Sequence, residues 1–247
     1  MNDKQSLLIT GASSGVGRSL ANFFKGRYHL VLGARRISRL NKYFGNRNDI
    51  SIYKLDLSEE ESVKLFCNNV LNEHGNISNL INNAGVNIRG RLENISISEI
   101  KYSLKVNSLG PLYLMNYFLE GMRNENYGRI INVTSGAPLN CFPEFGAYSA
   151  SKSFLNAVTV TAAKEHSNFN IKINLMSPGP VRSEMSPNSD LDPEVCHPMT
   201  NYLLNLDESG STGRFFWLKY EVPLFPDLEG VKWIEGKGND KLKEIKL

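Results

Sequence analysis

The feature that most constrains the fold is a regular alternation of short apolar runs with longer stretches of helical periodicity. Strands that alternate with helices in this way join through βαβ crossovers and pair in parallel. We therefore predict an α/β fold with a doubly wound, mainly parallel seven-stranded sheet, whose ligands bind beyond the carboxyl ends of the strands. The predicted strands are LLIT (7–10), HLVLGA (29–34), ISIYKLDL (50–57), NLIN (79–82), GRIINVTS (128–135), IKINLMS (171–177) and TGRFFWL (212–218).

Composition narrows the class of protein. A chain of 247 residues, 41% hydrophobic and without a Gly/Ser/Pro-rich linker, is expected to form one domain (1–247). The net charge of +3 is spread along the chain, which does not favour a nucleic-acid partner. No apolar run approaches a membrane span, and no secretory signal pattern is present. The three cysteines lack metal-ligand spacing. We expect a cytoplasmic protein with no membrane partner and no metal.

The segment TGASSGVG (10–17) lies between the first predicted strand and the following helix. Gly11 permits a tight turn, Gly15 lets a pyrophosphate approach the backbone, and Gly17 allows close packing of the helix. The helix N-terminus would offer its free N–H groups to the phosphates. A plain strand–helix turn is the alternative, and the position after the first strand favours a dinucleotide site. The predicted contacts are Gly11, Ser13, Ser14, Gly15, Val16 and Gly17.

The second predicted strand ends in GARR (33–36), where NAD-binding proteins tend to carry an acidic residue for the ribose 2′-hydroxyl. Here Arg35 and Arg36 stand instead, and two guanidiniums suit a 2′-phosphate. The alternative is that they begin a solvated helix. Because the acid is also missing, the sequence favours NADP(H) over NAD(H). The other cofactor contacts predicted at strand ends are Asp56 and Leu57 at the adenine, and Asn83, Ala84 and Gly85 at the adenosine.

Six motifs in order resemble those of the single-domain short-chain dehydrogenases/reductases: TGASSGVG, NNAG (82–85), KVNSLG, NVTSG, YSASK and SPGPV (177–181). The resemblance covers about residues 7–181 and returns near TGRFF. It implies a Rossmann-like fold, a nicotinamide cofactor and a homodimer or homotetramer. It also implies that Pro178, Gly179 and Val181 join Tyr148 and Lys152 at the cofactor. The catalytic tetrad implied by the family is Asn107, Ser135, Tyr148 and Lys152.

Tyr148 and Lys152 are four residues apart and share one helix face. An isolated pair of this kind is more simply a buried tyrosine beside a lysine whose head reaches water. With the other motifs present, we expect Lys152 to favour the phenolate of Tyr148 and to hold the nicotinamide ribose. Ser135 would bind the substrate oxygen, and Asn107 is implied to hold a water. The predicted function is an NADP(H)-dependent oxidoreductase acting on a small carbonyl or secondary alcohol. The alternative is a catalytically lapsed NADP(H)-binding regulatory or scaffold protein.

Two segments depart from the family pattern. Only residues 181–192 separate the SPGPV motif from the next predicted helix, which is too short for the usual helical lid. This segment either leaves an open mouth for a bulky substrate or is simply a short ordered loop. Residues 219–247 form an atypical C-terminal extension of the same domain. Its prolines and aromatics, including Phe225 and Trp233, predict packing on the body or on a partner subunit. The alternative is that they line the substrate mouth.

Overall fold

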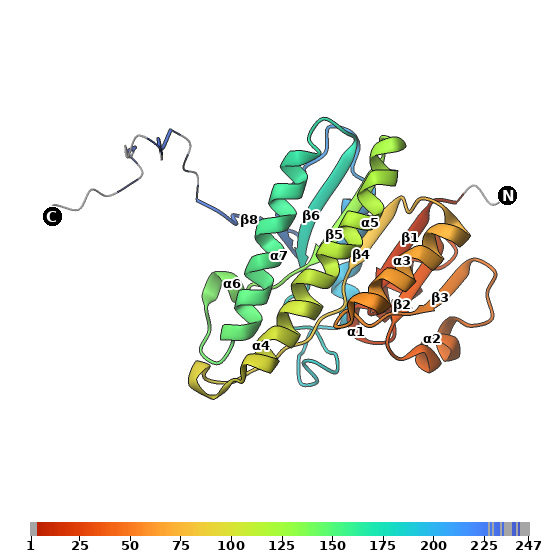
Figure 1. Cartoon of the computed structure of the whole chain (residues 1–247), viewed down its shortest axis with the longest axis horizontal. Coiled ribbons are helices and arrows are strands. Elements are labelled where there is room, and N and C mark those ends of the chain that lie inside the picture. Colours follow the sequence, from red (N-terminus) through yellow and green to blue (C-terminus); the bar gives the residue numbers. More distant parts are fainter. Residues whose placement is uncertain are drawn as a thin grey trace.

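In the computed structural model, which describes residues 4–226, 228, 230–232, 234, 239–240 and 242, eight strands form one sheet (Figure 1). Their order across the sheet is β3-β2-β1-β4-β5-β6-β7-β8. Strands β1 to β7 pair in parallel, and β8 runs antiparallel to β7. The strands are β1 (Ser6–Thr10), β2 (His29–Ala34), β3 (Ile50–Lys54), β4 (Asn79–Asn82), β5 (Gly128–Val133), β6 (Ile171–Ser177), β7 (Phe215–Trp217) and β8 (Tyr220–Val222).

The predicted doubly wound parallel sheet is confirmed, with one strand more than the seven expected. Strand β8 carries no apolar alternation that would have revealed it, because Tyr220 and Glu221 are exposed at the sheet edge. The sheet order reverses at β1: β2 and β3 are added on one side of it, and β4 and the later strands on the other. In doubly wound sheets the ligand crevice opens at this switch point.

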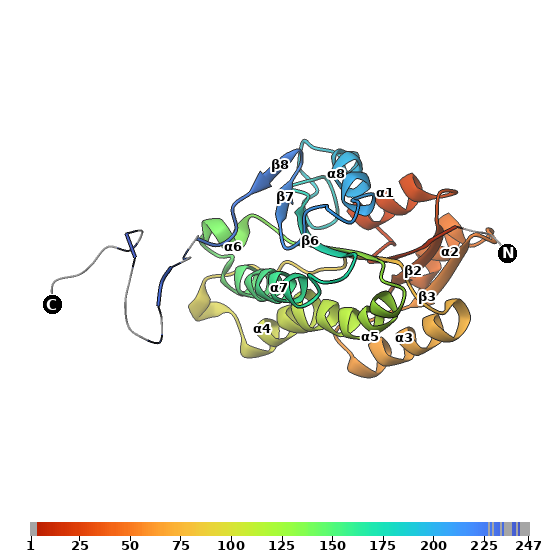
Figure 2. The same ribbon diagram turned by 90° about the horizontal axis from the view of Figure 1, so that it is seen from above.

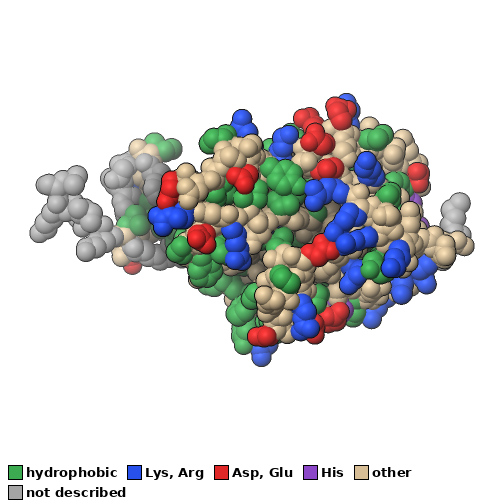
Figure 3. All heavy atoms as spheres, turned by 90° about the horizontal axis from the view of Figure 1, so that it is seen from below, with side chains coloured by type: hydrophobic (Ala, Val, Ile, Leu, Met, Phe, Trp, Pro, Cys, Tyr) green, Lys and Arg blue, Asp and Glu red, His purple; other side chains and the backbone are tan. Residues whose placement is uncertain are grey.

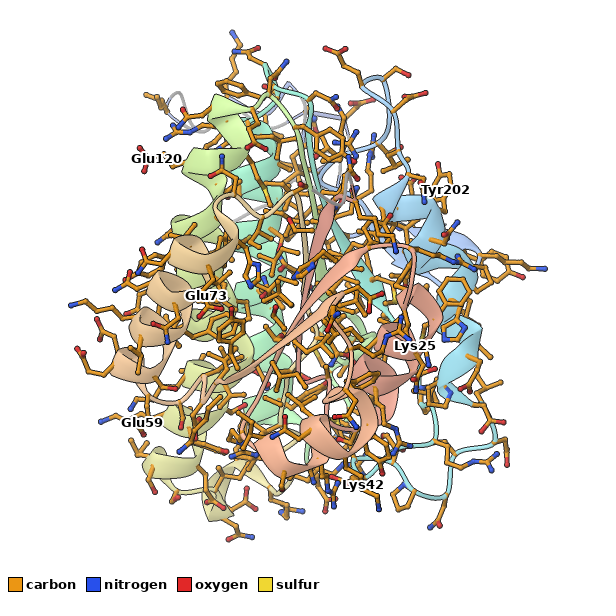
Figure 4. The ribbon with its side chains drawn as sticks, turned by 90° about the vertical axis from the view of Figure 1, so that its right-hand side faces the viewer. Lys25, Lys42, Glu59, Glu73, Glu120 and Tyr202 are labelled. Atoms are coloured by element: carbon orange, nitrogen blue, oxygen red, sulfur yellow. The ribbon has the colours of Figure 1, made fainter. Side chains whose placement is uncertain are left out.

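Helices cover both faces of the sheet (Figure 2). Figure 4 views the layers from one side, with Glu73 and Glu120 on one layer and Tyr202 on the other. On one face lie α1 (Gly15–Phe24), α2 (Ile37–Phe44) and α8 (His197–Leu204). On the other lie α3 (Glu60–His74), α4 (Ile97–Leu104), α5 (Gly110–Asn124) and α7 (Gly146–Glu165), with the short α6 (Ala137–Asn140) beside α7. A π-helical turn, Lys105–Leu109, joins α4 to α5. None of the described helices combines the length and apolar character needed to cross a bilayer.

The hydrophobic core is divided by the sheet into two clusters. Along β1, Leu7 and Ile9 pack with α1, α2 and α8, whereas Leu8 between them packs with α3 and α5. The same alternation recurs on β2, where Leu30 and Val31 enter opposite clusters. Successive strand side chains point to opposite faces, so both faces of each central strand are apolar. This is why these strands read as continuous apolar runs in the sequence.

A buried arginine ties the sheet to the segment that follows α8. Arg129 on β5 is 1% exposed, and its guanidinium donates to the Leu206 carbonyl oxygen at 2.9 and 2.6 Å. It also donates to the carbonyl oxygens of Gly128 and Asn170 at 2.7 and 2.8 Å. A buried cation is tolerated only when its donors are satisfied. Arg129 therefore fixes the position of the α8 segment against the sheet.

The two atypical segments have different structures. The 181–192 segment is an ordered loop, closed by pairing of Val181 with Leu191 and tightened by a second bridge within it. In the C-terminal extension, Phe225 is 54% exposed and does not enter the core. Trp233 lies outside the described residues. The 181–192 segment is thus a short ordered loop beside the cavity, and about half of the Phe225 side chain is exposed.

Candidate active site

A cavity of about 1050 Å³ opens at the carboxyl ends of the strands, at the switch point between β1 and β4. Figure 3 shows this face, with Lys and Arg side chains gathered on the side of α2 and hydrophobic side chains toward the side of α6. Sites for small molecules commonly enclose about 300–1,000 Å³, so this cavity lies at the upper end of that range. Of the predicted cofactor residues only Gly17 does not line the cavity. Those that do are Gly11, Ser13, Ser14, Gly15, Val16, Arg35, Arg36, Asp56, Leu57, Asn83, Ala84, Gly85, Tyr148, Lys152, Pro178, Gly179 and Val181.

The glycine turn is built for close approach. Gly11 has a φ of +70°, and a Cβ there would lie 2.8 Å from the Ala84 Cα. Gly17 lies behind the turn, where a Cβ would meet the Asn83 Nδ2 at 2.5 Å. The Thr10 hydroxyl accepts hydrogen bonds from the backbone N–H groups of Asn83 and Ala84, which joins the turn to the end of β4. The side chain of Ser14, the N-cap residue of α1, makes no capping hydrogen bond. Gly15 and Val16 of the first turn line the cavity, so the N-terminus of α1 is an anion site that fits a pyrophosphate.

The arginines after β2 make specific contacts. Arg35 donates to the Tyr102 hydroxyl at 2.8 Å, and Arg36 donates to the Ser14 hydroxyl at 2.8 Å. Arg36 also pairs at 2.7 Å with Glu184, a carboxylate of the 181–192 loop that the sequence did not reveal. Arg39 pairs with the same carboxylate. Hydrogen bonds from these guanidiniums hold the pKa of the Glu184 carboxyl below its ordinary value, and the bond from Arg39 has the larger effect. Arg39 could have been found from its place one helical turn beyond Arg36, whereas Glu184 has no such local signal.

Tyr148 and Ser135 meet in the cavity. Tyr148 lies on the first turn of α7 and is 8% exposed, and Ser135 follows β5. Burial raises the pKa of the Tyr148 phenol, while the hydrogen bond with Ser135 and the charge of Arg89 act in the opposite direction. The net direction is opposite to the lowering expected from Lys152. The Ser135 hydroxyl accepts from the Ala137 N–H at 3.1 Å, and this contact fixes its position.

Lys152 is 3% exposed, one turn along α7 from Tyr148. Its Nζ donates to the Val133 carbonyl oxygen at 2.8 Å, and burial lowers its pKa from 10.5 to about 8. A Cβ on Gly85 would lie 3.7 Å from this Nζ and 3.1 Å from the Asn107 Oδ1. A side chain at this position would be in tight contact with the Asn107 amide. The end of β4 therefore lies directly against the lysine.

Asn107 is held one layer behind the cavity wall. It is fully buried in the π-helical turn, and such turns recur at functional sites. Its side chain accepts from the Val86 N–H at 2.8 Å and donates to the Val86 carbonyl oxygen at 2.9 Å. It also donates to the Ser151 hydroxyl at 3.0 Å. Asn107 thus connects the segment after β4 to α7, between Tyr148 and Lys152, and does not itself line the cavity.

The mouth of the cavity beside Tyr148 is apolar. Its wall includes large side chains from three separate segments, and four of these are well exposed: Leu139, Phe142, Met185 and Trp217. The Arg89 guanidinium lies 4.2 Å from the centre of the Phe145 ring, which is an attractive cation–π contact. Arg89 has no ion pair in the described part of the chain. Sequence reasoning did not identify the side chains that line this mouth, because exposed aromatics carry no periodic signal.

Comparison with known proteins agrees with this geometry. Residues 5–194 match the sequence profile of a family described as short chain dehydrogenase. An uncharacterized oxidoreductase of Staphylococcus saprophyticus is 32% identical over 229 residues, which are 85% of this chain and 93% of that protein. A 3-ketodihydrosphingosine reductase of Bacteroides thetaiotaomicron is 32% identical over 187 residues, 76% of this chain and 68% of that protein.

Solved structures share the same architecture. ElxO with NADP bound is 27% identical and superposes with a TM-score of 0.79 over 87% of this chain and 97% of its own. An alcohol dehydrogenase from the archaeon Thermococcus sibiricus, complexed with 5-hydroxy-NADP, is 26% identical and superposes with a TM-score of 0.78 over 90% and 99%. The chain therefore belongs to the short-chain dehydrogenase family of oxidoreductases.

Proposed function

We propose that this protein is an NADP(H)-dependent oxidoreductase that interconverts a carbonyl group and a secondary alcohol on a small molecule. The observation that carries the proposal is the buried pair Tyr148 and Lys152 in the same cavity as a glycine turn and two arginines. Each feature alone has a structural explanation. Together they supply a proton donor, a positive charge and an anion site along one cleft. The NADP-bound state of ElxO supports the choice of cofactor.

The chain's own residues divide the work along the cavity. NADP(H), when bound, supplies or accepts the hydride at the substrate carbon. In the reductive direction the Tyr148 phenol donates its proton to the carbonyl oxygen as that oxygen gains charge. The Ser135 hydroxyl, which lines the same cavity as Tyr148, holds the same oxygen in place. In the reverse direction Tyr148 takes the alcohol proton.

Lys152 supplies the positive charge that this proton transfer needs. Burial raises the pKa of Tyr148, which would make the phenolate difficult to form at neutral pH. An ammonium one helical turn away favours the phenolate, and the low pKa of Lys152 makes this support fade above about pH 8. Asn107 positions the lysine by holding Ser151 and the chain beside Gly85. Arg35 and Arg36 at the other end of the cavity suit a 2′-phosphate.

The mouth suggests the class of substrate. Its wall of aromatic and aliphatic side chains would bury a bulky apolar group. Arg89 stands at that wall beside Phe145, and its charge acts on Tyr148. A guanidinium in this position would bind a carboxylate or phosphate on the substrate. We therefore propose an apolar carbonyl compound that carries an acidic group.

The decisive experiment is NADPH oxidation with a panel of carbonyl compounds, comparing the wild type with Tyr148→Phe. Loss of the proton donor should lower kcat by about 10²- to 10⁴-fold while the Kd of NADPH stays within about two-fold. Tyr43→Phe, on exposed α2 surface, is the matched control and should keep full activity. Full turnover in the Tyr148 variant would contradict the mechanism. Tight NADPH binding by a wild type that reduces nothing would favour the lapsed regulatory or scaffold alternative.

A further inference from the structure

A carboxylate from a distant part of the chain reaches the arginines at the ribose end of the cavity. Glu184 belongs to the loop after β6, 148 residues beyond Arg36 in the chain, and pairs with both Arg36 and Arg39. The loop lies directly on the glycine turn, since a Cβ on Gly15 would lie 3.2 Å from the Ser183 Cβ. Glu184 and its neighbours line the cavity.

One of these contacts involves Arg36, which lines the cavity with Arg35 and suits a 2′-phosphate, and Arg39 lies one helical turn beyond it. Arg36 donates one hydrogen bond to Ser14 on the glycine turn and another to Glu184. The Arg36 guanidinium therefore bridges the glycine turn and the carboxylate. Arg35 donates to the Tyr102 hydroxyl instead. A 2′-phosphate is a dianion near neutral pH, and it would be repelled by a carboxylate among its own ligands. To bind the phosphate through Arg36 and Arg39, Glu184 must leave them.

A ribose 2′-hydroxyl, in contrast to a 2′-phosphate, is bound well by a carboxylate. In NAD-binding proteins an acidic residue after the second strand accepts the hydrogen bond of that hydroxyl. The GARR sequence lacks this acid, and Glu184 brings a carboxylate to Arg36 of that sequence from a distant segment of the chain. NADH could therefore bind while the ion pairs stay in place.

We propose that Glu184 determines the cofactor preference: it competes with the 2′-phosphate of NADPH for Arg36 and Arg39, and it accepts the 2′-hydroxyl of NADH. The chain consequently uses both cofactors, with a smaller preference for NADPH than its arginines alone would give. This inference rests on the proposed nicotinamide site. It assigns to Glu184 a role at the adenosine end of the cofactor.

The expected effect is moderate. The paired side chains are 41%, 45% and 54% exposed, and exposed ion pairs are weak and screened by salt. Releasing two arginines from Glu184 should therefore tighten NADPH binding by about three- to ten-fold at low ionic strength. The gain should shrink as salt is added.

The test measures binding by calorimetry, without turnover. In Glu184→Gln, the Kd values of NADPH and of 2′,5′-ADP should fall about three- to ten-fold, while the Kd of NADH stays within about two-fold. Glu184→Ala also removes the hydroxyl acceptor and should weaken NADH about three-fold while NADPH still tightens. Asp192→Asn is the matched control, since it removes a charge from the same loop where Asp192 pairs with Arg182 at 3.4 Å outside the cavity.

Three results would overturn the inference. An unchanged or weaker NADPH affinity in Glu184→Gln would mean that the carboxylate orients the arginines and does not compete. Equal tightening of NADPH and NADH, or the same gain in Asp192→Asn, would mean that only the general charge of the loop acts. A wild type that binds neither cofactor would contradict the nicotinamide site itself. Cofactor binding without turnover would contradict only the proposed reaction.

Discussion

Replacing Lys152 with methionine should make the folded chain more stable at neutral pH while removing its activity. The Lys152 ammonium is 3% exposed, and it donates a hydrogen bond to the neutral carbonyl oxygen of Val133. Methionine keeps the length of the side chain without the charge. A buried charge without a counter-ion destabilises the folded state.

The pKa of Lys152 gives the size of the expected difference in the free energy of unfolding. Its depression from 10.5 to about 8 corresponds to about 3 kcal/mol, at about 1.4 kcal/mol for each pH unit. Losing the hydrogen bond to Val133 offsets about 1 kcal/mol, so Lys152→Met should be more stable by about 2 kcal/mol at about pH 7. Between about pH 8 and pH 10.5 only the unfolded chain keeps the lysine proton. Wild-type stability should therefore rise relative to the variant as the pH rises, and the two should become nearly equal at about pH 9.5.

Urea unfolding of both proteins at these two pH values measures the difference directly. Lys164→Met is the matched control, because Lys164 is exposed near the end of the same helix. Its difference from the wild type should not change with pH. A Lys152→Met variant that is less stable at neutral pH would refute the reasoning. A stability difference independent of pH would refute it equally, since it would mean that Lys152 keeps an ordinary pKa in the folded chain.

Two further predictions concern other arginines. Arg129→Met should lower the free energy of unfolding by about 2–4 kcal/mol, because it leaves buried carbonyl oxygens of Leu206 and Asn170 without donors. Arg123→Met on the surface of α5 should change it by less than about 0.5 kcal/mol in the same denaturation assay. Arg89→Met should raise the KM of an acidic apolar ketone about ten-fold and leave that of its neutral ester within about two-fold. Equal effects on both substrates in steady-state assays would contradict an anion-binding role for Arg89.

The fold was predictable because its signals are local. Apolar alternation and strand length identify a segment such as Leu7–Thr10 without knowledge of the rest of the chain. The glycine turn is equally local, since its close approach depends on Gly11 and on one neighbouring strand end. Strand β8 was missed because its exposed residues carry no such local apolar signal. It is held by pairing with β7 and not by an apolar face.

The parts of the site that escaped prediction depend on contacts between distant segments. Glu184 meets Arg36 only because the 181–192 loop folds back onto the glycine turn. No spacing rule connects residues so far apart. The pKa direction of Tyr148 was also beyond reach, because it depends on how deeply the folded chain buries the phenol. The sequence identified the chemical groups, and packing determined their ionisation.

The stability cost of burying Lys152 helps to decide whether the chain is an active enzyme or a catalytically lapsed binding protein. Binding a dinucleotide requires the glycine turn, the helix N-terminus and the arginines, all of which lie at the adenosine end of the cavity. Lys152 lies at the opposite end, beside Tyr148, and its burial lowers the stability of the fold by about 3 kcal/mol at neutral pH. A chain selected only for binding would gain stability by exchanging this lysine for an apolar residue. A buried, uncompensated ammonium one helical turn from a phenol therefore favours an active catalyst.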